Sequence, residues 1–262
     1  MKIIKVLLLL AYLIFLFGCS STAHYARRAT WMDEFKENGS PNNAMWTRSE
    51  TELNDTYLSV FCDNDSNAYI KNGKLHLRVY KTNDPQKPYK AGRVIINKEF
   101  HFKKGKLVIR AKSPISKGIW SAIWLNGPRT KEGYYAEIDV MEHVHAMGDT
   151  CYEAAYHLWG DFDGKKGNHT SYGEIVPISV NEWHIYTLEI TDNRIQISVD
   201  GKLMYDIYKG RYGDEWPKDQ DYSLRIGMSY GGYGAKRDGI DDSALPAEML
   251  VDYVRFYELK DN

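Results

Sequence analysis

The sequence predicts an all-β protein, a β-sandwich of the jelly-roll type. Short β-compatible runs recur along the chain, with turn signals about every 8–12 residues. Asn72-Gly73 and Asp200-Gly201 each stand between two such runs, as expected of two-residue hairpin turns. No stretch has the apolar spacing of a helix, and no internal repeat is present. The length of 262 residues suits one large β-domain.

The expected strands follow one another with short connections. They cover residues 31–35, 67–70, 74–80, 92–100, 105–111, 118–125, 137–143, 150–158, 183–191, 193–199, 202–208 and 249–259. Residues 82–89 contain two prolines and an aspartate and are expected to form a loop, as are residues 126–133.

Composition narrows the class of partner. The formal net charge is -1, which gives no reason to expect nucleic acid binding. Aromatic residues make up 13% of the chain, with 20 Tyr and 7 Trp. Sugar-binding clefts are one place where such a surplus of aromatic side chains is used.

The first residues predict export. In residues 1–18, two lysines precede an apolar run that is too short to span a bilayer, which is typical of a secretory signal peptide. Leu16-Phe17-Gly18-Cys19 resembles the bacterial lipobox. That resemblance implies that Cys19 carries a lipid and that residues 19–30 form a tether. The domain would then be anchored to the bacterial outer membrane and would lie in the periplasm or at the cell surface. The alternative is an ordinary cleaved signal peptide.

Two further cysteines follow. Cys62 and Cys151 are expected to be free, buried thiols, although they could pair if their Cα atoms lie within bridging distance.

The most informative stretch is Glu137-Ile138-Asp139-Val140-Met141-Glu142. In a strand, Glu137 and Asp139 point to one face, whereas Glu142 would point to the other. A β-bulge near Val140-Met141 would return Glu142 to the shared face. Two glutamates placed in this way could supply the paired carboxyl groups that a retaining glycosidase needs. The alternative interpretation is a solvated, acid-rich strand face.

In this setting the stretch resembles the E-x-D-x-x-E signature of glycoside hydrolase family 16, which includes laminarinases, agarases and porphyranases. Other segments stand in the order that the family shows: Asp33-Glu34-Phe35, Gly73-Lys74-Leu75, Gly118 to Leu125, Asn181 to His184, and Leu245 to Tyr257. The resemblance covers nearly the whole mature chain. It implies that residues 31–262 form a catalytic domain with a concave substrate groove, which hydrolyses internal β-glycosidic bonds by double displacement.

The resemblance also implies roles for individual residues. Glu137 would be the nucleophile and Glu142 the general acid/base, while Asp139 would hydrogen-bond the nucleophile and keep the protonation of the pair unequal. Trp120 and Trp124 lie four positions apart, so in a strand they face the same side, where indole rings could stack on sugars.

Three more substrate-binding candidates flank the motif: Tyr134, next to Tyr135, on one side, and His157 with Trp159 on the other. Each could also be structural. Many family laminarinases read W-P-x-x-G before the nucleophile, whereas this chain reads Glu132-Gly133-Tyr134-Tyr135-Ala136. The expected substrate is therefore left open between β-1,3 or β-1,4 glucans, galactans, and the β-galactosyl linkages of host mucin-type O-glycans.

Two other functions compete. A surface glycan-binding lipoprotein without turnover would normally lack one of the acids, and all three are present here. A metal site could combine His143 and His145 with His157, although such a histidine pair alone is weak evidence. We expect no required cofactor and a monomer. Some family members carry a structural calcium, for which Glu34, Gly73 and Asp252 are the candidate positions.

Overall fold

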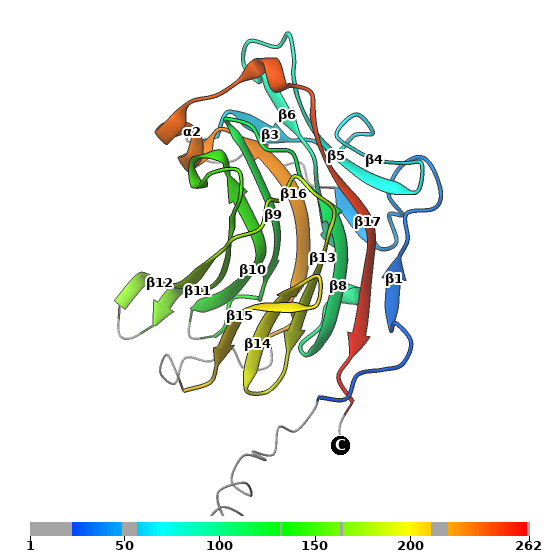
Figure 1. Ribbon diagram of the computed structural model, residues 1–262, viewed down its shortest axis with the longest axis vertical. Coiled ribbons are helices and arrows are strands. Elements are labelled where there is room, and N and C mark those ends of the chain that lie inside the picture. The colour runs from blue at the N-terminus through cyan, green and yellow to red at the C-terminus, as the bar shows by residue number, and fades with distance from the viewer. Residues whose placement is uncertain (1–22, 49–56, 132, 163–164, 211–219, 261–262) are drawn as a thin grey trace, which may run out of the picture.

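The computed structural model describes residues 23–48, 57–131, 133–162, 165–210 and 220–260 (Figure 1). It contains two stacked β-sheets, so the predicted β-sandwich is confirmed. The predicted signal peptide and Cys19 lie outside the described residues.

One sheet, called here the β10 sheet, has seven strands, and all its neighbouring strands are antiparallel. Its order from edge to edge is β12 (Lys165–Val176), β11 (Tyr152–Phe162), β10 (Tyr134–Val144), β9 (Ile119–Asn126), β16 (Ser223–Tyr230), β7 (Arg93–Ile96) and β2 (Trp46–Arg48).

The other sheet, called the β17 sheet, has ten strands. Its main path is β15 (Lys202–Tyr208), β14 (Arg194–Val199), β13 (His184–Ile190), β8 (Gly105–Lys112), β17 (Ala247–Glu258), β5 (Lys74–Lys81), β6 (Tyr89–Ala91) and β3 (Ser59–Phe61). In addition, β1 (Trp31–Asp33) pairs with β17, and β4 (Ala68–Lys71) pairs with β5.

The hydrophobic core lies between the sheets because every second residue of the central strands points inward. In β8, Leu107 and Ile109 are buried, and in β9 Ile123 and Leu125 are buried. The residues between them are only partly covered. In the β10 sheet, these alternate positions make up the face that points away from the core, and its central strands are visibly curved in Figure 1.

Most predicted strands are confirmed, as are both hairpin turns. Asn72 and Gly73 have φ values of 52° and 69°, and Asp200 and Gly201 have 50° and 79°, which is the conformation of a type I′ turn. Strands β2, β3, β6, β12 and β16 were not predicted. The expected strand over residues 92–100 ends earlier, because a 3₁₀ turn, Lys98–Phe100, follows β7.

The expectation of no helix is wrong in one place. Helix α2 (Gly232–Asp238) spans seven residues and follows β16. Two of its residues are glycines and no apolar stripe is present, so its sequence carries no helical signal. Short 3₁₀ turns also occur at His145–Met147 and Asp242–Ala244. None of the helices in the described ranges is long and apolar enough to cross a membrane.

Cys62 and Cys151 are not joined by a disulfide, as predicted, but both are half-buried rather than buried. Of the positions considered for calcium, Glu34 is bound by Arg255, and Asp252 forms an ion pair with Arg110. Within the described part of the chain, no group of three His, Cys, Asp or Glu side chains is arranged to hold a metal ion. The calcium site stays a prediction.

Candidate active site

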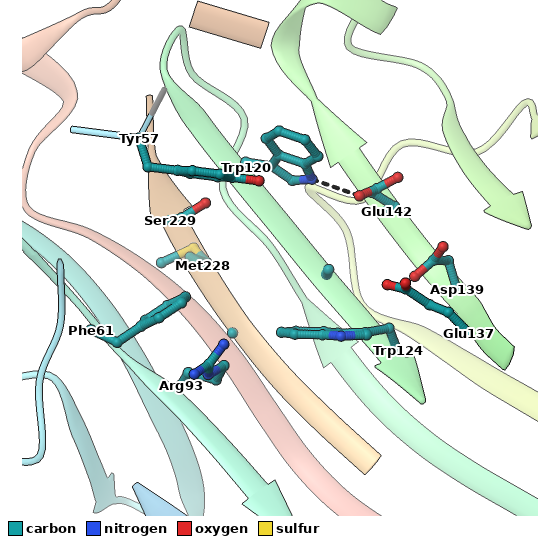
Figure 2. Close-up of a pocket in the computed structure, with 12 residues that line it drawn as sticks. Tyr57, Phe61, Arg93, Trp120, Trp124, Glu137, Asp139, Glu142, Met228 and Ser229 are labelled. Atoms are coloured by element: carbon teal, nitrogen blue, oxygen red, sulfur yellow. Dashed lines mark hydrogen bonds between the residues drawn. The ribbon is translucent and has the colours of Figure 1, made fainter. Parts of the chain in front are cut away.

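A β-bulge in β10 brings the three acids of the motif to one face. Asp139 lies opposite Ala155 of β11, but Glu142 lies opposite Glu153, so one extra residue of β10 is accommodated between them. The ladder with β9 shifts at the same place. Val140 and Met141 are both buried. The predicted bulge is therefore confirmed, and two consecutive core-facing residues return Glu142 to the side of Glu137 and Asp139 (Figure 2).

The three acids line a pocket on the outward face of the β10 sheet (Figure 2). Strand β9 contributes Trp120 and Trp124 to the wall, so the prediction that these two indoles share a face is confirmed. The indole Nε1 of Trp120 donates a hydrogen bond of 2.8 Å to Glu142 Oε1. The pocket thus combines carboxyl groups with flat apolar surfaces, the usual composition of a sugar-binding site.

Burial and mutual repulsion raise the pKa values of both glutamates. Burial and the charge of Asp139 raise the pKa of Glu137 to about 7. The same two causes raise the pKa of Glu142 to about 8, against the hydrogen bond from Trp120, which lowers it. The pair therefore holds a proton near neutral pH, with Glu142 the more readily protonated member.

Asp139 is 3% exposed and is held by a histidine. His157 lies directly opposite Glu137 in the register, and its Nε2 donates to Asp139 Oδ2 at 2.8 Å. Burial raises the pKa of Asp139, and the contact with His157 opposes that rise. Burial lowers the pKa of His157, but Asp139 and the two glutamates outweigh it, so the net direction is upward. Asp139 thus makes its hydrogen bond to His157, and the two side chains stabilise each other's charged forms.

Trp159 and Tyr134 have different surroundings. Trp159 stacks on His169 of β12, with ring centroids 3.5 Å apart, and its side chain also contacts the carboxyl group of Glu137, whose pKa this contact lowers. Tyr134 packs against the hydrophobic core. The substrate-binding prediction for Tyr134 is therefore wrong, because alternation places Tyr135 on the face of Glu137 and Tyr134 on the other. Burial and the charge of Glu137 raise the pKa of Tyr135, which agrees with this placement.

The alternative metal site does not form. His143 is fully buried, and its Nε2 contacts the carbonyl oxygen of Gly148. His145 begins a 3₁₀ turn and pairs with Asp238 of α2. His157 is bound to Asp139. The three histidines thus serve three separate contacts.

Several pocket residues were missed by sequence reasoning. They are Tyr57, Phe61, Arg93, Gly227, Met228 and Ser229. Tyr57 stacks on Trp120 with ring centroids 5.4 Å apart, and the Arg93 guanidinium lies 4.1 Å from the ring centroid of Phe61. For β16, the alternation of apolar and polar residues over 224–230 was a usable signal. Tyr57 and Phe61 carry no such signal, because a very short strand and its flank bring them to the pocket.

A jelly-roll sandwich with buried, paired carboxyl groups in an aromatic pocket has the features of a glycoside hydrolase. Comparisons with known proteins agree. Residues 54–255, most of the chain, match the sequence profile of glycosyl hydrolases family 16, and the chain belongs to this family. It is an endo-acting glycoside hydrolase.

Three similar proteins illustrate the relationship. A beta-glucanase of Rhodothermus marinus is 30% identical over 98% of this chain and 96% of its own length. A keratan-sulfate endo-1,4-beta-galactosidase of Sphingobacterium multivorum is 29% identical over 87% of this chain, but only 54% of its own length is covered. The solved structure of SCLam, a non-specific endo-beta-1,3(4)-glucanase, matches with a TM-score of 0.77 and 26% identity over 91% of this chain and 94% of that one.

Proposed function

We propose that this protein hydrolyses internal β-1,3 or β-1,4 linkages of a β-glucan with retention of anomeric configuration. The observation that carries the proposal is the bulged strand, which places Glu137 and Glu142 on one pocket face with Asp139 between them. The similarity to two glucanases supports glucan as the first substrate to test.

In the first step, Glu142 donates its proton to the glycosidic oxygen while the Glu137 carboxylate attacks the anomeric carbon. The bond to the leaving sugar breaks, and a glycosyl ester forms on Glu137. In the second step, Glu142 takes a proton from water, whose oxygen attacks the same carbon and releases Glu137. The order of the two pKa values supports this division of roles, because the acid must keep its proton when the nucleophile has lost its own.

The aromatic wall would hold the sugars on either side of the cleaved bond. Trp124 lies across from Asp139 in the ladder, and Trp120 is fixed both by Tyr57 and by its hydrogen bond to Glu142. Indole faces stack on the apolar faces of pyranose rings, and this stacking tolerates several sugar types.

A second candidate is an endo-β-galactosidase acting on host mucin-type O-glycans. It is favoured by the similarity to the Sphingobacterium enzyme and by Tyr135, which stands beside Glu137 where many laminarinases carry a different pattern. The stacking surfaces would serve galactose as well as glucose.

The decisive experiment is a product profile of residues 20–262. Laminarin, barley mixed-linkage glucan, agarose, porphyran, keratan sulfate and mucin O-glycans are each incubated with the wild type and with Glu137→Gln. We expect oligosaccharides from a β-glucan with the wild type and none with the variant. Release only from galactose-containing glycans would select the second candidate. Binding without release would identify a non-catalytic glycan-binding protein.

We also propose that Cys19 carries the lipid that anchors the domain to the bacterial outer membrane. The support is the lipobox-like sequence before it. Expression of the full chain and of Cys19→Ser with labelled palmitate tests this. Label and membrane fractionation should both be lost in the variant. An unlabelled wild-type chain in the soluble fraction would contradict the anchor.

A further inference from the structure

A line of hydrogen-bonded side chains leads from the buried acids to the edge of the β10 sheet. His157 contacts Asp139 through Nε2 at 2.8 Å, and its other ring nitrogen, Nδ1, lies 3.1 Å from Nε2 of His169. His169 belongs to β12, the edge strand, and its side chain is exposed. The line therefore joins the pocket floor to solvent through two imidazole rings.

The ring of His169 is held in one plane. It lies flat on Trp159, with centroids 3.5 Å apart and planes inclined by 4°. His157 stacks beside both rings, at 5.3 Å from His169 and 5.7 Å from Trp159. Because this packing fixes the direction of His169 Nε2, the contact with His157 is built by three side chains from two strands rather than by a chance approach.

A contact between two ring nitrogens needs one donor and one acceptor, so the two histidines cannot both be charged. Burial and the charge of His157 lower the pKa of His169. The net pKa of His157 is raised, because Asp139 and the glutamates outweigh its burial. The shared proton therefore resides on His157, whose Nδ1–H donates to the lone pair of a neutral His169.

The charged and titratable groups facing His157 all favour this state. Strand β10 presents Glu137, Asp139 and Glu142, and β11 presents Glu153. Strand β12 presents His169. Four carboxyl groups thus favour the imidazolium form of His157, and the neutral ring of His169 accepts the hydrogen bond from its Nδ1–H.

We propose that His169 is a positioning residue of the active site: it accepts the Nδ1–H of His157, holds the imidazolium against Asp139, and thereby sets the pH range in which Glu137 is ionised while Glu142 is protonated. This inference rests on the proposed roles of the two glutamates. His169 itself touches no reacting atom and acts only through His157.

The test compares His169→Phe with His169→Gln. Phenylalanine keeps a flat ring over Trp159 but offers no acceptor, whereas the glutamine amide oxygen can accept the Nδ1–H. The control is Thr170→Ala, the next residue of β12, which points to the other face. Histidine ¹⁵N NMR follows the titration of His157 in each full-length protein, and kcat/KM is measured against pH on the polymer that the wild type cleaves.

In His169→Phe, we expect the midpoint of His157 to fall by about one pH unit, because its charged form loses a hydrogen bond. The positive charge of His157 lowers the pKa of both glutamates. Its loss should therefore move the whole bell-shaped profile to higher pH by about half a unit or more. His169→Gln and Thr170→Ala should keep the wild-type midpoint and profile.

An unchanged His157 midpoint in His169→Phe would overturn the inference. So would a wild-type spectrum in which His169 carries the charge while His157 is neutral, and this measurement needs no variant to fold. The NMR titration also needs no substrate. If the wild type cleaves none of the polymers while the His157 midpoint shifts as expected, the proposed hydrolysis is wrong, but the hydrogen bond from His157 to His169 is supported.

Discussion

Carboxylates project outward from both sheets, but their electrical surroundings are opposite. Beside the β17 sheet, Glu34 accepts hydrogen bonds of 2.6 and 3.0 Å from Arg255, which hold its pKa below the usual range. Glu248 of β17 is bound by Tyr69 and His76, and these bonds outweigh its burial, so its pKa is also lowered.

On the β10 sheet, the acids of the motif face one another, and their pKa values are raised. The alternating pattern that points a carboxylate outward is the same in both sheets. What differs is the partner: a matched cation makes the carboxylate a stabilising contact, whereas a neighbouring acid leaves it reactive. The following predictions test that contrast, beginning with the largest expected effect.

Removing either glutamate of the pocket should abolish turnover. Glu137→Gly and Glu142→Gly are expected to lose roughly three to five orders of magnitude in kcat, because each step needs both groups. With an activated aryl glycoside, azide should restore product in both. Azide takes the place of the nucleophile in Glu137→Gly and gives the α-glycosyl azide, and in Glu142→Gly it attacks the glycosyl enzyme and gives the β-anomer. The same anomer from both variants would contradict the roles.

Asp139→Asn should reduce kcat/KM by roughly tenfold to a hundredfold, since the ring of His157 loses its charged partner. The charge of Asp139 raises the pKa of Glu142. Its removal should therefore move the upper limb of the pH profile to lower pH. A profile that keeps its upper limb, measured on the same substrate, would show that Asp139 does not govern the proton of Glu142.

The wild-type profile of kcat/KM should be a bell with limbs at about 7 and about 8, the values expected for Glu137 and Glu142 in the free enzyme. Below the lower limb Glu137 is protonated and cannot attack, and above the upper limb Glu142 has no proton to donate. Beyond each limb, the rate should fall roughly tenfold per pH unit. The two limbs describe the coupled pair. An optimum below pH 6 would contradict the raised pKa values.

Trp120→Phe removes the 2.8 Å hydrogen bond to Glu142 and keeps an aromatic ring beside Tyr57. Because that bond lowers the pKa of Glu142, its loss should move the upper limb to higher pH. We expect a decrease in kcat of about fivefold, the effect of one hydrogen bond of about 1 kcal/mol. Trp124→Phe, in the same pocket, is the control and should leave the upper limb in place.

The sequence predicted the sandwich, both hairpins and the bulge. The first two depend on local alternation and turn residues, and the bulge follows from the odd spacing of five residues between Glu137 and Glu142. It did not predict β3 or the pocket position of Tyr57, since a three-residue strand has too few residues to show a period. Tyr134 was misplaced for a related reason. It was predicted to bind substrate because it lies close to the acidic motif in the sequence, but the face to which a side chain points is decided by the alternation along the strand.

The relation between His157 and His169 could not be predicted from the sequence either. The two residues lie on the neighbouring strands β11 and β12, and β12 has a polar, glycine-containing sequence without a clear strand pattern. Its register with β11 is a property of the folded sheet. The groups that hold the acids in position were therefore harder to predict than the acids themselves.

The smallest effect on activity, and the clearest on stability, is expected for Glu34→Gln. Its folded pKa is lowered, so Glu34 contributes stability above its unfolded pKa of about 4.3 and loses it as pH falls through the folded value. At pH 7 the variant should lose about 0.5–1 kcal/mol of unfolding free energy, measured by urea denaturation, and at pH 3 the loss should shrink.

Glu137→Gln should have the opposite effect on the free energy of unfolding. Its raised pKa means that ionisation disfavours folding as pH rises from about 4.3 to about 7, so this variant should be more stable than the wild type at pH 8. Destabilisation by both substitutions would remove the contrast between the two sheets.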